Sequence, residues 1–377
     1  MSCIHLFNCD NDLALANFSP GFTPPATIRQ MMEELAELPA AWETGNKVPP
    51  DENLPHGQAD DTVTSVSVWG WSPAVCHRLR HMGVPESLLP TQTQLQEIRR
   101  LSSRERAVEL LRQMRDDGVC AAFASLYCTD EAQVDEALSR WPRTILKAPW
   151  SGSGKGLRYG QGGREDTLRG WYQRIIQQQG GVVVEPLYDK LHDLAMEFWS
   201  DGAGSVSYQG LSLFDTHPNG AYRGNLLMPE AEKQAWLDRF IPSSQSLAVR
   251  RWLEQHLGRM IGTSYRGYLG VDMMLVTPPS LSSFSCYSAS YPPRESSEAT
   301  GAAGPILHPM VEINLRMTMG MVSILLQRRL QQGYHGVFRL DYFARPEDML
   351  ADNAQRQASS PQFQVLCAGP HYRAYIE

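Results

Sequence analysis

The spacing of apolar residues in the first hundred positions predicts a small lobe of alternating strands and helices. Strands are predicted at 3–8, which is mostly apolar, and at 63–69, where apolar residues alternate with Thr and Ser. A helical pattern follows each strand, at 27–38 and at 72–81. The polar run 8–12 is predicted to be a loop. Two such units predict a Rossmann-like lobe, too short to form a complete nucleotide-binding domain.

Beyond residue 92 the pattern predicts an α+β arrangement in two parts. The first part surrounds a short, wholly apolar strand, and the second consists mainly of long strands expected to pair antiparallel. The predicted elements are helices at 92–114, 130–140, 167–178, 244–261 and 317–332, and strands at 119–129, 143–147, 182–184, 193–199, 205–214, 268–276, 310–314, 338–343 and 363–368. The first helix is expected to break near 101–103, with Ser102 and Glu105 at capping-box spacing.

These patterns divide the chain into three predicted domains. An α/β lobe covers 1–101, a first α+β subdomain covers 102–187, and a second covers 188–377. Residues 277–305 are rich in Ser, Pro and Ala. This composition does not supply a core, which predicts a mobile insertion within the last domain.

Composition narrows the class of partner. Of the 377 residues, 42% are hydrophobic and 20% charged, and the 34 basic residues are scattered under a net charge of −7, so no nucleic-acid surface is expected. No window approaches the roughly 18 consecutive apolar residues of a membrane helix. Seven cysteines without a C-x-x-C pair, and a start unlike a signal peptide, predict a cytoplasmic protein. Oligomeric state is left open, with a homodimer as one option.

A glycine-rich loop follows the predicted strand that ends in Lys147. The loop consists of Ser151, Gly152, Ser153, Gly154, Lys155 and Gly156. Its glycines let the backbone approach a ligand, and its N–H groups and lysines suit a polyphosphate. It is not a P-loop, because Pro149 replaces the first glycine and Gly156 replaces the Ser or Thr after the lysine. A surface hairpin is the alternative interpretation.

Two later strands carry candidate metal ligands. Asp272 lies in an otherwise apolar strand, where a buried carboxylate needs a cation. Strand periodicity places Glu312, Asn314 and Arg316 on one face. Carboxylate and amide oxygens suit Mg²⁺, and the arginine suits a phosphate that the ion carries. A solvated strand face with an incidental ion pair is the alternative.

The order of glycine loop, apolar strand ending in Glu185, strand aspartate and Glu-x-Asn-x-Arg resembles the ATP-grasp superfamily, which includes D-alanine–D-alanine ligase and biotin carboxylase. The resemblance covers roughly 102–377. It implies that ATP lies between two α+β subdomains, with Mg²⁺, or Mn²⁺ in its place.

The resemblance also implies roles for individual residues. Lys147 would contact the α and β phosphates, and the 151–156 loop would close over the triphosphate. The segment Glu185, Pro186 and Leu187 would form the hinge around the adenine, and Asp193 would bind the ribose. A lysine is usual where this chain has Arg104.

The same resemblance assigns the second half of the site. Asp272, Glu312 and Asn314 would be the magnesium ligands, and Arg316 would face the transferring phosphoryl group, with Lys155 as a further catalytic candidate.

The implied activity is ATP-dependent ligation of a small-molecule carboxylate to an amine through an acylphosphate. Arg223, predicted on a loop, is a candidate for holding the carboxylate or the acylphosphate. Residues 8–12 and Thr23 are candidates for the amine side. A small-molecule kinase of the same fold and a nucleotide-binding module without turnover are the alternatives.

Overall fold

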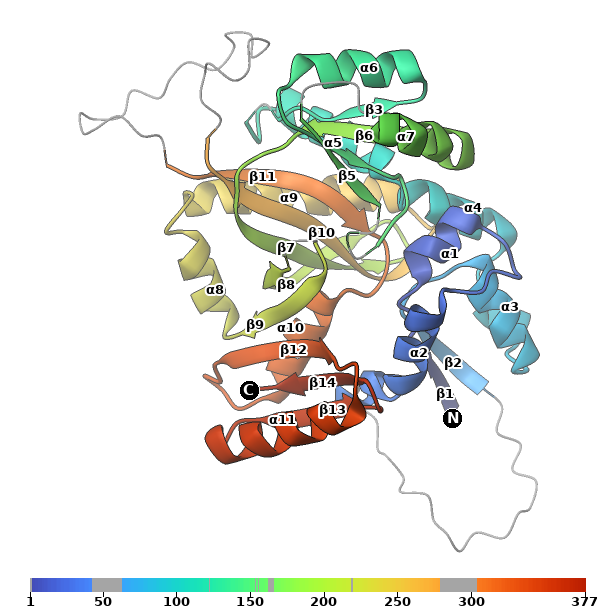
Figure 1. Cartoon of the computed structure of the whole chain (residues 1–377), viewed down its shortest axis with the longest axis vertical. Coiled ribbons are helices and arrows are strands. Elements are labelled where there is room, and N and C mark those ends of the chain that lie inside the picture. Colours follow the sequence, from blue (N-terminus) through green and yellow to red (C-terminus); the bar gives the residue numbers. More distant parts are fainter. Residues whose placement is uncertain are drawn as a thin grey trace, which may run out of the picture.

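The computed structural model describes residues 2–42, 63–121, 123–152, 154, 156–161, 166–217, 220–278 and 304–377. Most of the predicted insertion, and the loop residues Ser153 and Lys155, lie outside this description. In Figure 1 the N-terminal lobe lies to one side of a small sheet and a large sheet, and the end of the chain adds strands to the large one.

The N-terminal lobe has the predicted β–α alternation. Its elements are strands β1 (Ser2–Leu6) and β2 (Val63–Val68), which pair in parallel, and helices α1 (Asn11–Asn17), α2 (Ala26–Glu34), α3 (Pro73–His81) and α4 (Gln92–Leu101). The prediction of a loop over 8–12 is wrong in its second half, because α1 begins at Asn11. The turn before α1 is short because Asn8 clamps it to the second strand: its side chain donates to the Gly70 carbonyl (2.8 Å) and accepts from the Trp69 amide (2.9 Å).

The small sheet has the strand order β3-β6-β4-β5. Its strands are β3 (Leu126–Cys128), β6 (Val182–Pro186), β4 (Thr144–Lys147) and β5 (Leu157–Gly160), and the helices beside it are α5 (Arg104–Asp116), α6 (Glu131–Arg140) and α7 (Asp166–Gln179). Val134, Leu168 and Val184 belong to the buried core that joins α6 and α7 to the sheet. The break between α4 and α5 is confirmed, but the N-cap is Ser103, whose Oγ accepts from the Glu105 amide, and not Ser102.

The large sheet has the strand order β11-β10-β7-β8-β9-β12-β14-β13. These strands are β7 (Lys190–Asp201), β8 (Val206–Thr216), β9 (Tyr222–Leu227), β10 (Arg266–Val276), β11 (Ile306–Asn314), β12 (Gly336–Tyr342), β13 (Gln364–Ala368) and β14 (Tyr372–Ile376), and the helices are α8 (Glu230–Leu237), α9 (Ser243–Ile261), α10 (Met319–Arg329) and α11 (Pro346–Ser359). The predicted domain boundaries fall between α4 and α5 and between β6 and β7. No helix among the described residues is long and apolar enough to cross a membrane.

Alternation along β7 separates the core of the large sheet from its open face. Leu194, Met196 and Phe198 are buried in the core that includes α9 residues. Asp193 and Glu197, at the intervening positions, line a cavity on the opposite face. The sheet therefore presents its polar positions to the space between the domains.

The strand β9 corrects one prediction. Residues 222–225 were expected in a loop because Tyr-Arg-Gly-Asn has the composition of a turn. Instead they pair with both neighbours: Asn225 is opposite Phe214 on β8 and Phe338 on β12. This pairing with a distant C-terminal strand supplies the backbone partners that the local composition did not suggest.

Candidate functional site

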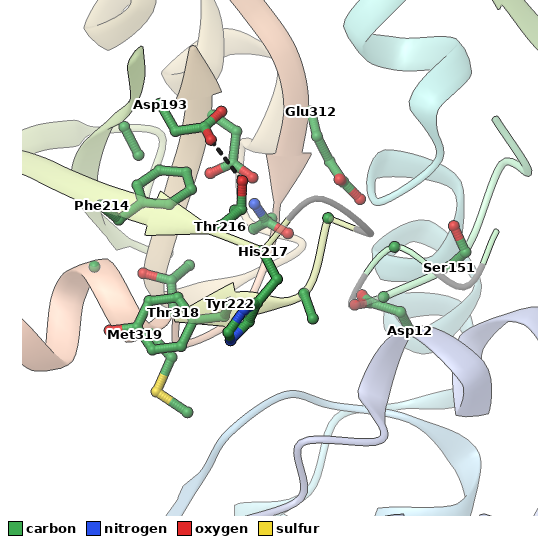
Figure 2. Close-up of a pocket in the computed structure, with 18 of the residues that line it drawn as sticks. Asp12, Ser151, Asp193, Phe214, Thr216, His217, Tyr222, Glu312, Thr318 and Met319 are labelled. Atoms are coloured by element: carbon green, nitrogen blue, oxygen red, sulfur yellow. Dashed lines mark hydrogen bonds between the residues drawn. The ribbon is translucent and has the colours of Figure 1, made fainter. Parts of the chain in front are cut away.

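One large cavity, about 1,210 Å³ in volume, lies where the small sheet, the large sheet and the N-terminal lobe meet. Most of the predicted site residues line it: Arg104, Lys147, Ser151, Gly152, Gly154, Glu185, Pro186, Leu187, Asp193, Asp272, Glu312, Asn314 and Arg316. Figure 2 shows Ser151 and Asp12 on one side of the cavity, Asp193 and Thr216 on the other side, and Glu312 between these two groups. Residues separated by more than 150 positions thus share one site.

Lys147 and Glu185 form a buried ion pair at the small-sheet end of the cavity. They lie on the antiparallel neighbours β4 and β6, and Lys147 Nζ is 2.6 Å from Glu185 Oε2. The Ser125 hydroxyl donates to Glu185 Oε1 at 2.8 Å. Burial raises the pKa of the Glu185 carboxyl, but the charge of Lys147 and these hydrogen bonds outweigh it and hold that pKa below its usual value. Glu185 is therefore ionised, and it fixes Lys147 at the cavity.

Replacing Lys147 with Met is expected to reduce the free energy of unfolding by about 3–5 kcal/mol, because it leaves a buried carboxylate without its cation. The double variant K147M/E185Q removes both charges and should recover most of this loss. Urea unfolding of the two single variants and the double variant measures the coupling. Equal destabilisation by K147M and by the double variant would contradict the pairing.

Asp272, Glu312 and Asn314 lie together on β10 and β11 and fit a magnesium ion. Asp272 and Glu312 are directly opposite each other in the strand register, an arrangement of like charges that is unfavourable without a cation. Burial, and then the charge of Glu312, raises the pKa of Asp272 to about 7, against a hydrogen bond from Asn314. Mg²⁺ prefers such oxygen ligands. The described residues contain no metal-binding group of three His, Cys, Asp or Glu side chains, since the third ligand here is an amide.

Arg104 connects the glycine loop to the candidate metal ligands. Its Nη2 is 2.7 Å from Glu312 Oε2, and its Nη1 donates to Ser151 Oγ (2.7 Å) and to the Ala148 carbonyl (2.6 Å). The implied role of Arg104 in binding the nucleotide, at a position where a lysine is usual, stays a prediction. The contacts present position Glu312 and the start of the loop.

Arg316 is held by Asp12, which belongs to the N-terminal lobe. Arg316 donates from Nε to Asp12 Oδ1 (3.1 Å), from Nη2 to Asp12 Oδ2 (2.8 Å), and from Nη2 to Asn314 Oδ1 (2.8 Å). A Cβ added to Gly152 would lie 2.9 Å from Asp12 Oδ2. Asp12 therefore joins the N-terminal lobe, the glycine loop and the metal strand at one point.

Asp193 also lines the cavity, and its implied role in binding the ribose stays a prediction. Its Oδ2 accepts from the Thr216 hydroxyl at 2.9 Å, the bond drawn in Figure 2, and also contacts Lys190 Nζ. Apolar side chains of Ile145, Leu187 and Met274 line the same cavity. A polar edge beside apolar walls suits a nucleoside.

Three predicted residues are placed differently. Arg223 lies on β9, is exposed and is not among the lining residues, so the prediction of a cavity-facing loop arginine is wrong. Gly156 packs against Ser151, since a Cβ there would lie 2.1 Å from Ser151 Oγ. Thr23 does not line the cavity either, whereas Asp10 and Asp12 do.

Glu197 is a cavity residue that no sequence prediction included. It is 1% exposed, and burial raises the pKa of its carboxyl to about 8. The available signal was parity: Glu197 is four positions after Asp193 on the same strand and therefore faces the same way.

His308 predicts a pH dependence of stability. It is fully buried beside the rings of Phe123 and Tyr188, and burial lowers its pKa to about 4, against the attraction of Glu185. Because the unfolded chain binds a proton at higher pH than the native state, stability is lost as the pH falls from about 6.5 to about 4. The loss should approach about 3 kcal/mol relative to H308Q. Denaturant unfolding at several pH values measures it, and parallel curves for the two proteins would contradict it.

No protein-family model matches the chain, and no curated protein sequence matches it. Solved structures similar to it include an ADP complex of N5-carboxyaminoimidazole synthetase from Staphylococcus aureus (12% identity, 82% of this chain and 75% of that chain, TM-score 0.45). Another is a biotin carboxylase complex from Campylobacter jejuni (11%, 99% and 86%, 0.47), and a third is D-alanyl-alanine synthetase A from Vibrio cholerae (13%, 72% and 73%, 0.38).

Proposed function

We propose that this protein is an ATP- and Mg²⁺-dependent ligase that joins a small-molecule carboxylate to an amine through an acylphosphate. One observation carries the proposal: the Lys147–Glu185 pair, the described part of the glycine loop and the Asp272, Glu312 and Asn314 trio face the same cavity. Each belongs to a different stretch of the sequence.

The nucleotide would occupy the part of the cavity between the two sheets. Lys147 would neutralise phosphate charge, and loop backbone around Gly152 and Gly154 would approach the same oxygens. Asp193 would accept from ribose hydroxyls. In this arrangement the γ-phosphoryl group would lie near Asp272 and Glu312.

Asp272, Glu312 and Asn314 would hold Mg²⁺, which when bound supplies neutralisation of phosphate oxygens. The chain's own part is positioning and electrostatic stabilisation, with the Arg316 guanidinium beside the same phosphates. A substrate carboxylate oxygen forms a bond to the γ-phosphorus as the bond to the ADP oxygen breaks. The amine nitrogen then attacks the acyl carbon, inorganic phosphate leaves, and the amine loses a proton.

The size of the cavity supports two reactants besides the nucleotide. At about 1,210 Å³ it exceeds the range of roughly 300–1,000 Å³ typical of a site for one small ligand. The part beyond the trio is lined by N-terminal residues such as Asp10 and Met31 and by C-terminal residues such as Tyr342 and Tyr372.

The test is a hydroxamate assay. The protein, ATP and Mg²⁺ are incubated with hydroxylamine and a panel of carboxylates, and ADP and hydroxamate are measured together. A ligase gives both products in equal amounts with at least one carboxylate. ADP formation that depends on a hydroxyl compound and gives no hydroxamate would indicate a kinase. Binding of a non-hydrolysable ATP analogue without ADP formation from any panel member would indicate a module without turnover.

A further inference from the structure

A cluster of polar side chains lies at the cavity next to the candidate metal ligands, and none of the roles proposed above uses it. The cluster consists of Glu197, Ser212, Tyr222, Asn225 and Thr318, which all line the cavity. They come from β7, β8, β9 and the N-cap of α10. In Figure 2 Tyr222 and Thr318 lie on the side of the cavity away from Ser151. We call this set the Glu197 cluster.

Most hydrogen-bonding capacity of the cluster is already used. The Tyr222 hydroxyl donates to Asn225 Oδ1 at 2.6 Å, and Asn225 Nδ2 donates to Ser212 Oγ at 2.7 Å. Thr318 donates to the Glu197 carboxylate. Glu197 Oε2, however, is buried and has no hydrogen-bond partner among the described residues. The capacity left over is that of one oxygen of the Glu197 carboxyl, which acts as an acceptor when a bound cation keeps this carboxyl ionised.

No cation of the described chain fills this place. Arg316 and, more weakly, Lys233 on α8 attract Glu197, but no ion pair within 4.0 Å joins Glu197 to either of them in the described part of the structure. Asp272 lies close enough to oppose the charge of Glu197. A buried carboxylate that is neither paired nor fully hydrogen-bonded is costly, so its retention at a cavity indicates a ligand.

Two glycines leave room for this carboxylate. A Cβ added to Gly320 would lie 2.2 Å from Glu197 Oε1 and 2.6 Å from Ser212 Oγ. A Cβ added to Gly270 would lie 2.7 Å from Glu197 Oε2. Side chains at either position would displace Glu197, so the local sequence is matched to a carboxylate at this point.

The unfilled acceptor selects a ligand rich in N–H groups. An ionised Glu197 would oppose a carboxylate or phosphate at this point, and a second metal ion would find only one carboxylate in the cluster. Beyond the cluster the cavity wall carries aromatic rings, including Phe343 and Tyr342, the latter 58% exposed. Such rings pack against an apolar body or a cation.

We propose that the Glu197 cluster binds the amino group of the acceptor substrate, and that this acceptor is a primary amine with an aromatic or apolar body. The assignment rests on the proposed ligase function and adds to it the class and the orientation of the amine. The amine nitrogen points toward Glu197, beside the trio, and the body extends toward the C-terminal strands.

The test measures ligand-induced shifts of the melting temperature in the presence of Mg²⁺ and a non-hydrolysable ATP analogue. The probes are phenethylamine, tyramine and aromatic amino-acid amides, with 2-phenylethanol as a probe of similar shape that has a neutral hydroxyl in place of the amine. Wild-type protein should be stabilised by at least one amine and not by 2-phenylethanol. The variant E197Q should keep the shift caused by the nucleotide analogue and lose at least three quarters of the shift caused by the amine.

The matched control is E232Q, which changes an exposed glutamate on α8 that pairs with His335, does not line the cavity and should keep both shifts. An amine shift retained in E197Q, an equal shift by 2-phenylethanol, or no shift by any amine while the nucleotide shift is intact would each overturn the assignment. Loss of the nucleotide shift in the wild type would instead contradict the proposed function itself.

Discussion

Replacing Glu312 with Gln is expected to lower kcat by on the order of 1,000-fold, the upper range for losing one electrostatic contact to a transition state. Glu312 is one of two carboxylates in the candidate metal trio, and Gln keeps its shape while removing its charge. The change also takes a partner from Arg104, whose Nη2 lies 2.7 Å from Glu312 Oε2. Activity should therefore fall together with Mg²⁺ affinity, and raising Mg²⁺ should recover part of it.

The measurement is kcat as a function of Mg²⁺ concentration, with circular dichroism as the test of folding. The control E131Q makes the same carboxylate-to-amide change in an exposed ion pair with Arg169. Neither of these two residues lines the cavity. If E312Q has the same kcat as the wild type at the Mg²⁺ concentration that half-saturates the wild type, the metal assignment is contradicted.

Strand parity and apolar runs were sufficient to predict the strands that carry much of the candidate site, whereas the roles of Glu185 and Asp193 were implied only by the family resemblance. The strands carrying Lys147, Glu185, Asp272 and Glu312 were predicted because each has a local pattern, and buried charge on an apolar strand is a local signal too. Each of these four side chains can be singled out from the sequence pattern of the strand that contains it. These are the residues that the structure brings to one cavity.

The residues that were missed or misplaced depend on contacts between distant segments. Asp12 was a candidate for the amine side, but its contact with Arg316 spans 304 positions, and no local pattern in the run 8–12 indicates that contact. Arg223 was expected on a loop because its local sequence does not indicate a strand. It lies on β9, which pairs with β12, more than a hundred residues later in the sequence. Glu197 had a signal, its parity with Asp193, but an isolated glutamate on a strand does not indicate whether that face is open or buried.

The contact between Asp12 and Arg316 predicts large losses of kcat when either residue is replaced. Arg316→Met should lower kcat on the order of 1,000-fold if the guanidinium stabilises the transferring phosphoryl group, because that interaction is strongest in the transition state. Asp12→Asn keeps the arginine but weakens the two hydrogen bonds that orient it, and we expect a loss of about 100-fold in kcat. The KM for ATP should change little, because neither residue is placed against the nucleoside.

A double-mutant cycle separates positioning from an independent role of Asp12. If Asp12 acts through Arg316, the variant D12N/R316M should be no less active than R316M alone, since the orienting contact has nothing left to orient. Additive losses would show that Asp12 acts separately, for instance on the acceptor. The control E86Q, at an exposed pair with Arg80 in the same lobe, should leave kcat unchanged. Since Asp12 also abuts Gly152, a further readout is proteolysis of the glycine loop, which should quicken in D12N and not in E86Q if the same carboxylate restrains both the arginine and the loop.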